Sequence, residues 1–322
     1  MTSGSASRRY LVAILAVLAL AASQGAERFV NRILRPDAEE IGWISDAVLA
    51  AGFVVTSWLW VRLRETQIAL TDLERQQIVT ETQLTMAARV QTSLLPALPG
   101  PSAGISWYAA AEPAGKVGGD YYDFVPLPDG RMCVVLGDVS GKGIAAALFL
   151  ANVRATLRAL ARDATHPRTL LTNLSSALFA DSTSGLYLTC IIAIVDPRNR
   201  SMVYTNAGHP AGVLWSRGGV RDFRVGGPPA GLLYGVSFEE EHVTFSDGDL
   251  VVFVSDGITE ALDASGDRVV EAIATQIEQA ERPTPDAVCA RLLWAARRGP
   301  GPPGVDGWTD DRTAVVFGSV GV

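Results

Sequence analysis

Four aspartates stand at the ends of apolar strands or inside tight glycine turns, where a carboxylate is well placed for chemistry. Asp120 follows Val-Gly-Gly, Asp138 precedes Val-Ser-Gly-Lys-Gly, Asp256 lies in Ser-Asp-Gly and Asp310 in Asp-Asp-Arg-Thr. An aspartate just past a buried strand is held rigidly, and neighbouring glycines let a ligand approach the backbone. Converging carboxylates repel one another unless cations neutralise them. The set therefore predicts a site for hard divalent cations such as Mg²⁺ or Mn²⁺.

Other kinds of site have little support in the sequence. The three cysteines are far apart and the chain has only three histidines, so neither a disulfide framework nor a zinc site is expected. Residues 137–143 lack the spacing of a nucleotide-binding phosphate loop. A single Asp-Gly pair is usually a turn, so the metal prediction depends on the ordered set of four aspartates.

The composition narrows the class of protein. The chain has 322 residues, with 27 Lys and Arg against 34 Asp and Glu, a net charge of −7. That balance argues against a nucleic-acid partner bound through a basic face. With 48% hydrophobic and 19% charged residues, the chain is not disordered overall.

Two apolar runs, residues 10–26 and 41–63, predict a transmembrane helical hairpin over residues 1–63. The second run is long enough to cross a hydrocarbon core of about 30 Å, and its charges are Asp46 near one end and Arg62 at the other. Arginines before the first run and after the second place the rest of the chain in the cytoplasm, at the inner (plasma) membrane. The alternative for the first run is a cleaved signal peptide.

Residues 64–96 predict a helical linker, because residues 62–95 contain no Gly or Pro and are rich in helix formers. A heptad pattern fits this segment, but half of its core positions are polar or weakly apolar. The helix could transmit a signal or be a passive spacer. Pro96 ends it, and residues 97–322 form the second domain.

From residue 105 the pattern changes to short apolar strands joined by turns such as Pro128-Asp129-Gly130. Helical periodicity is confined to two pairs of segments. Strands linked by hairpins, with helices in pairs, predict an antiparallel α+β fold rather than a doubly wound sheet. The expected strands are 105–111, 120–127, 131–139, 186–195, 201–207, 213–216, 239–245, 250–255 and 313–320, and the expected helices are 144–163, 167–180, 268–280 and 284–297.

Six motifs occur in a fixed order: Val-Gln-Thr-Ser-Leu-Leu-Pro (90–96), Gly-Gly-Asp-Tyr-Tyr-Asp (118–123), Asp-Val-Ser-Gly-Lys-Gly (138–143), Asn-Ala-Gly-His-Pro (206–210), Ser-Asp-Gly-Ile-Thr-Glu-Ala (255–261) and Asp-Asp-Arg-Thr (310–313). Together they resemble the metal-dependent protein phosphatases, also called protein phosphatase 2C. Within that family the resemblance is to the bacterial SpoIIE and RsbU branch, and it covers residues 86–320.

The resemblance implies a β-sandwich flanked by helices, an αββα fold, with two Mn²⁺ or Mg²⁺ ions at one end of the sheets. Asp138 would bridge the ions, with the Val139 carbonyl close to one of them. Asp120, Asp256 and Asp310 would complete the carboxylate shell. Because metal-activated water would attack phosphorus, Ser140 and Ser255 are read as turn residues rather than nucleophiles.

Four further residues have roles that the sequence leaves open. Asp311 stands beside the last ligand, Asp310, and is expected to contact the metal ligands rather than the metal. His209, in a Gly-His-Pro turn, is read as structural, with acid catalysis as the alternative. The arginine with which other members of the family bind phosphate has no equivalent before Asp120. Lys116 and Lys142 are the nearby cations, and each is either a phosphate contact or a solvated side chain.

The resemblance further implies a membrane-anchored protein serine/threonine phosphatase whose substrate is an anti-sigma-factor antagonist. The linker helix would pack beside the helix that begins at Ile144, and dimerisation through residues 66–94 would switch the activity. One alternative is a catalytically silent membrane scaffold that binds its partner without turnover. A sensor built on the loop of residues 27–40 is disfavoured, because so short a loop cannot readily enclose a ligand.

Overall fold

The computed structural model describes residues 39–101, 105–181, 185–262, 268–299 and 310–319, with a few positions between 16 and 26; the side chains of 39–47 are outside that description. The chain divides into two compact units, residues 1–81 and 82–322. The predicted first membrane span, residues 10–26, lies mostly outside the described residues.

A single unbroken helix, α2 (Glu39–Leu94), contains both the predicted second span and the predicted linker. The absence of Gly and Pro after Gly52 agrees with this continuity. Between Val48 and Leu63 most of its large apolar side chains are exposed, and Phe53 and Val61 are half-buried. Within the described residues, the helix that is long and apolar enough to cross a membrane is α3 (Ile144–Ala161), with a mean hydropathy of 1.5. One side of α3 is buried in the domain core, which accounts for that hydropathy.

Two antiparallel sheets form the centre of residues 82–322. The first has the order β1 (Ile105–Glu112), β11 (Arg312–Ser319), β10 (Leu250–Val254), β6 (Gly212–Ser216) and β7 (Gly219–Phe223). The second has the order β2 (Asp120–Pro126), β3 (Met132–Val139), β4 (Leu188–Asp196), β5 (Ser201–Ala207) and β8 (Gly226–Gly227), with β9 (Glu241–Thr244) also paired to β5. The short β8 pairs parallel to β5; the other pairs are antiparallel.

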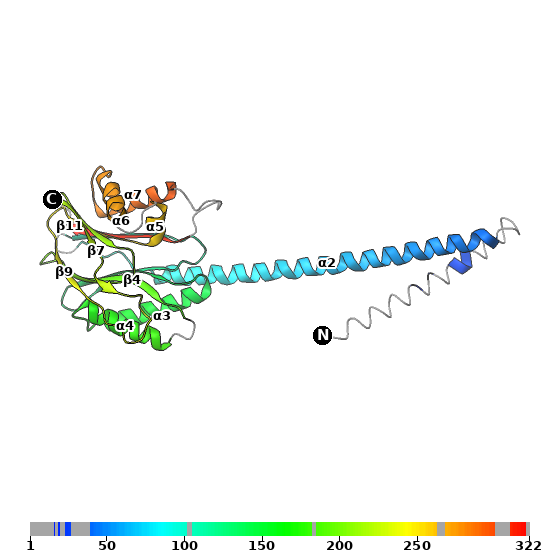
Figure 1. Cartoon of the computed structure of the whole chain (residues 1–322), viewed down its shortest axis with the longest axis horizontal. Coiled ribbons are helices and arrows are strands. Elements are labelled where there is room, and N and C mark those ends of the chain that lie inside the picture. The colour runs from blue at the N-terminus through cyan, green and yellow to red at the C-terminus, as the bar shows by residue number, and fades with distance from the viewer. Residues whose placement is uncertain are drawn as a thin grey trace. The chain divides into compact units, whose positions relative to one another are not determined.

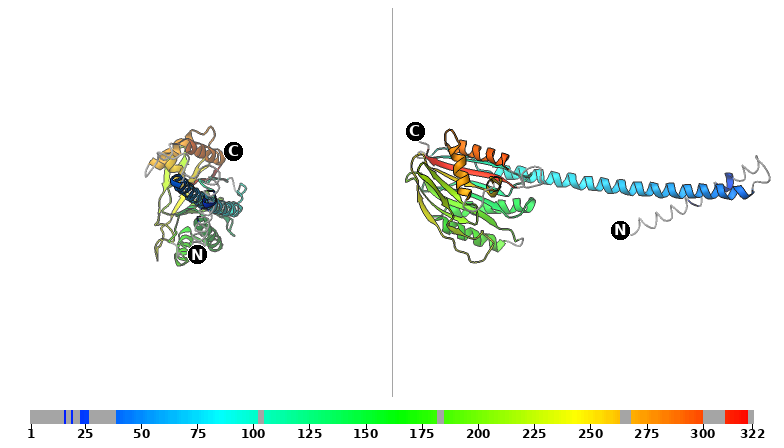
Figure 2. Two further views of the ribbon diagram at one scale, coloured as in Figure 1. Left: turned by 90° about the vertical axis from the view of Figure 1, so that its right-hand side faces the viewer. Right: turned by 45° about the horizontal axis from the view of Figure 1, so that its top comes forward.

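Helices cover the outer face of each sheet. Figures 1 and 2 show α3 and α4 (Pro167–Asp181) against one sheet, and α6 (Arg268–Glu278) and α7 (Pro285–Arg298) against the other, with the short α5 (Asp256–Ala261) beside them. Three buried apolar clusters fill the spaces between these four layers. The predicted α+β sandwich flanked by helices is therefore confirmed.

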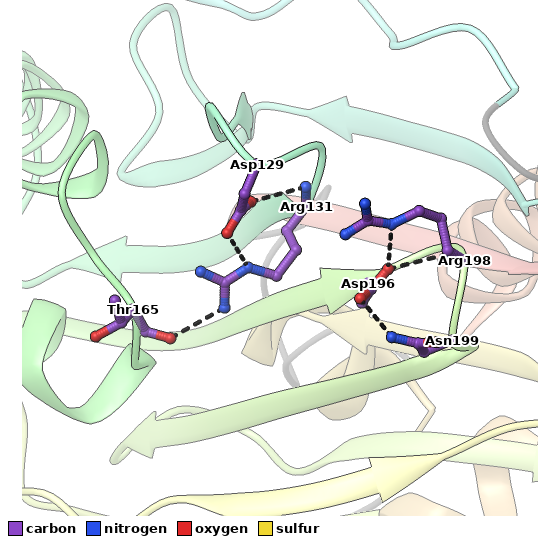
Figure 3. Close-up of polar contacts among 6 residues, drawn as sticks. All are labelled: Asp129, Arg131, Thr165, Asp196, Arg198 and Asn199. Atoms are coloured by element: carbon purple, nitrogen blue, oxygen red, sulfur yellow. Dashed lines mark hydrogen bonds and ion pairs between the residues drawn. The ribbon is translucent and has the colours of Figure 1, made fainter.

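The hairpin turns at one end of the second sheet are fixed by aspartates paired with arginines. Asp129 accepts hydrogen bonds from the backbone and side chain of Arg131 (3.1 and 2.7 Å), and Arg131 also donates to the Thr165 carbonyl (3.0 Å) (Figure 3). In the β4–β5 turn, Asp196 accepts hydrogen bonds from Arg198 and Asn199. Since β2 begins at Asp120 and β3 ends at Val139, the candidate metal ligands lie at the opposite end.

Candidate metal centre

Asp120 and Asp138 face each other across neighbouring strands. The first residue of β2, Asp120, pairs in register with Asp138 near the end of β3. Beside them, Gly119 packs so closely that a Cβ atom there would lie 2.6 Å from Asp138 Oδ1 and 3.1 Å from the Val139 carbonyl oxygen. Those two oxygens therefore share one small region next to Gly119. This is the arrangement expected if both were to approach one cation.

The other sheet supplies Asp256 and Asp310. Asp256 is the first residue of α5, two positions after the end of β10, and Asp310 stands two residues before β11, the neighbour of β10. Ser255 joins these segments, since its hydroxyl donates to the Asp311 carbonyl (3.1 Å) and accepts from the Thr313 N–H (2.9 Å). Ser255 is thus held in backbone hydrogen bonds, as expected for a turn residue.

Asp311 uses its carboxylate to hold a loop. Oδ1 accepts a hydrogen bond from the Ala114 N–H (2.7 Å), and Oδ2 accepts a short one from the Gly119 N–H. The loop that ends at Asp120 is therefore tied to the segment that carries Asp310. The sequence predicts that Asp311 lies near the ligands but does not explain why the residue is charged. These hydrogen bonds explain it, because a carboxylate accepts two N–H groups more strongly than a neutral side chain does.

Three of the described carboxylates at this end of the sandwich have raised pKa values. Burial raises the pKa of Asp120 well above its ordinary value, and the charges of Asp138 and Asp311 add to the shift. The pKa of Asp138 rises to about 7, first because of burial and then because of Asp256, Asp310 and Asp311. Burial and Asp310 also raise the pKa of Asp256. These residues are close enough for each charge to disfavour the others.

Asp120 shows the clearest need for a cation. Neither of its buried carboxylate oxygens accepts a hydrogen bond from any described residue. The hydroxyls of Thr313 and Ser255 lie near and oppose the rise in its pKa, but neither reaches hydrogen-bonding geometry. A buried carboxylate without donors is costly, and a metal ion would satisfy it.

A cavity of about 420 Å³ opens over the site. Its walls include Gly119, Asp138, Val139, Asp310 and Asp311. Both candidate lysines border it: the Lys142 ammonium lies 3.4 Å from Asp310 Oδ1, and Lys116 lies 3.4 Å from the Thr85 hydroxyl of α2. Lys142 thus has a carboxylate partner, although its side chain is 71% exposed, and both predicted roles of the lysine stay open.

His209 lies beneath the site and away from solvent. Its Nδ1 is 3.2 Å from the Thr189 hydroxyl, which is 3.4 Å from the Asp138 carbonyl oxygen. The Asn206 amide holds the turn by donating to the His209 carbonyl and accepting from its N–H. Burial lowers the pKa of His209 to about 3, so its imidazole is neutral. This placement favours the structural role over acid catalysis.

The described part of the chain contains no group of three or more His, Cys, Asp or Glu side chains arranged to hold a metal ion. The fit to a divalent cation therefore depends on the orphaned oxygens of Asp120, on the mutual repulsion of the carboxylates and on the oxygen pair beside Gly119. These oxygens are hard donors, the type that Mn²⁺ and Mg²⁺ prefer.

Comparison with known proteins agrees with this geometry. The family model of Stage II sporulation protein E (SpoIIE) matches residues 128–318, more than half of the chain. The chain belongs to the SpoIIE family. It therefore falls in the SpoIIE and RsbU-like branch of the metal-dependent protein phosphatases, as its motifs predict.

Individual relatives of this SpoIIE-family chain are distant. The phosphoserine phosphatase RsbU of Bacillus subtilis is 28% identical over 196 residues, which are 60% of this chain and 57% of RsbU. The chain thus spans little more than half the length of that relative. The phosphatase domain of B. subtilis SpoIIE, solved with a fragment of its regulatory domain, has a TM-score of 0.57 at 21% identity, covering 66% of this chain and 62% of that one.

A solved structure of the serine/threonine phosphatase PstP, in complex with two manganese ions, has a TM-score of 0.51 at 17% identity and covers 67% of this chain and 99% of that one. At these identities the likeness of the solved structures shows the shared fold.

Proposed function

We propose that this chain is a membrane-anchored, metal-dependent protein serine/threonine phosphatase. Its substrate would be a phosphoserine or phosphothreonine on a cytoplasmic regulator, an anti-sigma-factor antagonist. The observation that carries the proposal is the buried Asp120 carboxylate, which accepts no hydrogen bond from the described residues. Asp120 pairs across β2 and β3 with Asp138, which borders the open cavity. Membership of the SpoIIE family and the name of RsbU, a phosphoserine phosphatase, support the same conclusion.

Asp138, Asp120, Asp256 and Asp310, with the Val139 carbonyl, would hold two Mn²⁺ or Mg²⁺ ions. Such ions, when bound, activate water and neutralise phosphoryl oxygens during attack on phosphorus. The serines near the site are engaged elsewhere, since the Ser140 hydroxyl accepts from the Tyr187 N–H (2.9 Å) and Ser255 bridges two backbone segments. Neither is placed as a nucleophile.

Lys116 and Lys142 line the cavity of about 420 Å³ from opposite segments of the chain. We propose that their ammonium groups attract the substrate phosphate, which has no arginine to meet it before Asp120. Exchange of Lys142 for Ala should then raise KM for a phosphoprotein more than it lowers kcat. An unchanged KM would assign phosphate binding to the carboxylate-bound ions alone.

The membrane part of the proposal comes from α2. Most of its large apolar side chains between Val48 and Leu63 are exposed in the described part of the chain, and the guanidinium groups of Arg62 and Arg64 stack on Trp58 and Trp60. Tryptophan beside arginine is typical of a cytoplasmic membrane interface. Protease treatment of sealed inside-out vesicles should release the domain of residues 82–322, and protection of that domain would reverse the topology.

The proposed activity can be tested with the full chain in detergent. With Mn²⁺ it should hydrolyse p-nitrophenyl phosphate and a phosphorylated antagonist, and Asp138→Asn and Asp256→Asn should each lower kcat by about 10³-fold or more. Asp129→Asn, at the far end of the sandwich, is the matched control and should retain full activity. If the unaltered chain and all three variants are equally active, the proposed site is wrong.

The alternative function is the silent scaffold, which is favoured by one observation. No group of three metal-binding side chains is ready-made within the described residues. If the unaltered chain retains its phosphorylated partner without releasing phosphate at saturating Mn²⁺, the scaffold is correct and the phosphatase proposal is wrong.

A further inference from the structure

The loop of residues 231–235, between β8 and β9, carries exposed apolar side chains. Leu232 and Leu233 are both exposed, and the following Tyr234 is 85% exposed. The ring of Phe179, an exposed residue near the end of α4, packs against that of Tyr234 with the ring centroids 5.7 Å apart. No residue of the loop is charged. We call these four side chains the Leu-Leu-Tyr patch.

The base of the loop is fixed by hydrogen bonds. Ala230 and Leu188 exchange both of their backbone hydrogen bonds (2.8 and 3.0 Å), and the Gly231 N–H donates to the buried Ser175 hydroxyl of α4 (3.0 Å). A Cβ atom at Gly231 would lie 3.0 Å from Leu178 Cβ, so the loop also packs tightly on α4. The patch is therefore held in place at the surface. Exposed leucine and aromatic side chains on such a fixed support are typical of a protein interaction surface.

The patch lies at the metal end of the sandwich. Leu188, the first residue of β4, pairs with Val139 of β3 on one side and with Ala230 on the other. Neighbouring strands are about 4.8 Å apart, so the backbone of Ala230 lies about 10 Å from that of Val139. The three residues from Ala230 to Leu233 span at most about 10 Å more. The patch therefore begins within about 20 Å of the proposed metal ligand Val139.

A single protein substrate can cover both the cavity and the patch. A standard interface takes about 800 Å² from each partner, which is a disc about 30 Å across. That width exceeds the distance from Val139 to the patch. Charged side chains border the cavity itself: Lys116, Lys142, Asp310 and Asp311. The apolar contact that the centre of a protein interface needs is supplied beside the cavity, by the patch.

We propose that the Leu-Leu-Tyr patch is the docking surface for the folded phosphoprotein substrate. The partner is a globular phosphoprotein with an uncharged, apolar surface about 10–20 Å from its phosphoserine or phosphothreonine. This inference rests on the proposed function and deepens it, because it names the surface by which the substrate is selected. A substrate that fills only the cavity, such as p-nitrophenyl phosphate or a short phosphopeptide, gains nothing from the patch.

The test compares Leu233→Ser with Val220→Ser in the full chain with Mn²⁺. Val220, an exposed apolar residue of β7, is the matched control because it lies at the other end of the sandwich: it pairs with Trp215, which also pairs with Leu250 at the start of β10. The readout is kcat/KM for the phosphorylated antagonist divided by kcat/KM for p-nitrophenyl phosphate. A loss of folded enzyme cancels in this ratio. Tyr234→Ser is the second variant, since so exposed a side chain contributes little to the fold.

We expect Leu233→Ser and Tyr234→Ser each to lower this ratio by about 10–30-fold, the loss typical of truncating a central interface residue, while Val220→Ser matches the unaltered chain. A short phosphopeptide of the antagonist should show no such loss.

The inference alone is overturned if the antagonist is hydrolysed and the ratio is the same in all four proteins. It is also overturned if light scattering shows that Leu233→Ser turns a dimer into a monomer at an unchanged ratio, because a second copy of the chain then covers the patch. If the unaltered chain hydrolyses p-nitrophenyl phosphate but not the antagonist, the proposed substrate and the docking surface are both wrong, while the phosphatase activity stands. Hydrolysis of neither compound overturns the proposed function and the inference together.

Discussion

Two aspartates with buried carboxylates, three residues apart on β2, differ in their hydrogen-bond partners. Asp123 accepts a bidentate pair of hydrogen bonds from Arg158 of α3 (2.7 Å each), together with one from the Tyr121 hydroxyl (2.7 Å) and one from the Phe124 N–H (2.9 Å). Asp120 has none from any described residue. The first carboxylate is satisfied by the protein and fixes a helix to a sheet, whereas the second needs a cation from outside.

The same contrast separates the two ends of the sandwich. In the turns, the pKa of Asp129 is lowered by the backbone and side chain of Arg131; for Asp196, burial raises the pKa but the contacts with Arg198 outweigh it and lower it (Figure 3). At the other end, burial and mutual repulsion raise the pKa values of Asp120, Asp138 and Asp256. Carboxylates whose charged forms are disfavoured by burial and by one another thus mark where an ion is required.

The largest expected effect comes from removing the partner of Asp123. Arg158→Met removes the bidentate partner of a fully buried carboxylate and leaves it Arg154 as a cationic neighbour, whose Nε lies 3.9 Å away. We therefore expect the free energy of unfolding to fall by about 3 kcal/mol, the low end for a broken buried pair. Denaturant unfolding measures it. Adding Asp123→Leu should restore much of the loss, because the charge is then gone. A loss under about 1 kcal/mol would mean that the pair is no stronger than one on the surface.

The buried His209 predicts a dependence of stability on pH. Its folded pKa, about 3, lies below the ordinary 6.5, so the unfolded chain takes up a proton that the folded chain does not. The stability it confers is complete above pH 6.5 and is lost as the pH falls towards 3. Relative to His209→Asn, the unaltered chain should lose about 1.4 kcal/mol per pH unit between pH 6 and 4.5. Parallel curves for both proteins would contradict a neutral, buried imidazole.

Gly119→Ala should damage the site and leave the fold largely intact. The new Cβ would lie 2.6 Å from Asp138 Oδ1 and 3.1 Å from the Val139 carbonyl, so these oxygens must move. We expect Mn²⁺-dependent activity to fall by about tenfold. Gly115→Ala in the same loop is the control, because its Cβ would meet only the Val117 carbonyl at 3.7 Å. Equal activity in both variants would place the metal elsewhere.

The smallest effect is expected at the turn end. Asp129→Asn removes a half-exposed ion pair with Arg131 and should cost less than about 1 kcal/mol of stability. Thermal unfolding measures this change. A larger loss would show that the two ends differ less than their pKa shifts indicate.

Much of this fold follows from local patterns in the sequence. The strands that begin at Ile105 and Asp120 and the helix that begins at Ile144 start where alternation and helical periodicity predict. Three elements were missed. The strand β7 has no apolar alternation, since its residues are mostly exposed, and β8 consists of two glycines. The helix α5 has only six residues, and its Ser-Asp-Gly start resembles a loop.

The site was only partly predictable. Asp120, Asp138, Asp256 and Asp310 could be chosen from glycine neighbours and strand ends, and their convergence at one end of the sandwich agrees with that choice. Two other sets of contacts could not be predicted: the hydrogen bond from the Gly118 N–H to Gln91 and the one from the Ala114 N–H to Asp311. Each joins segments that are distant in sequence through a backbone group that nearly every residue type carries. The predicted contact of α2 with α3 stays a prediction, as does dimerisation through residues 66–94.

The most direct test of the account is the location of Mn²⁺ in crystals of the chain, from its anomalous scattering. We expect metal peaks among the carboxylates of Asp120, Asp138, Asp256 and Asp310, with none beside Asp123 or Asp129, whose arginine partners already satisfy them. Crystals grown in millimolar Mn²⁺ that show no peak at the first four aspartates would contradict the claim that these four carboxylates form a metal centre.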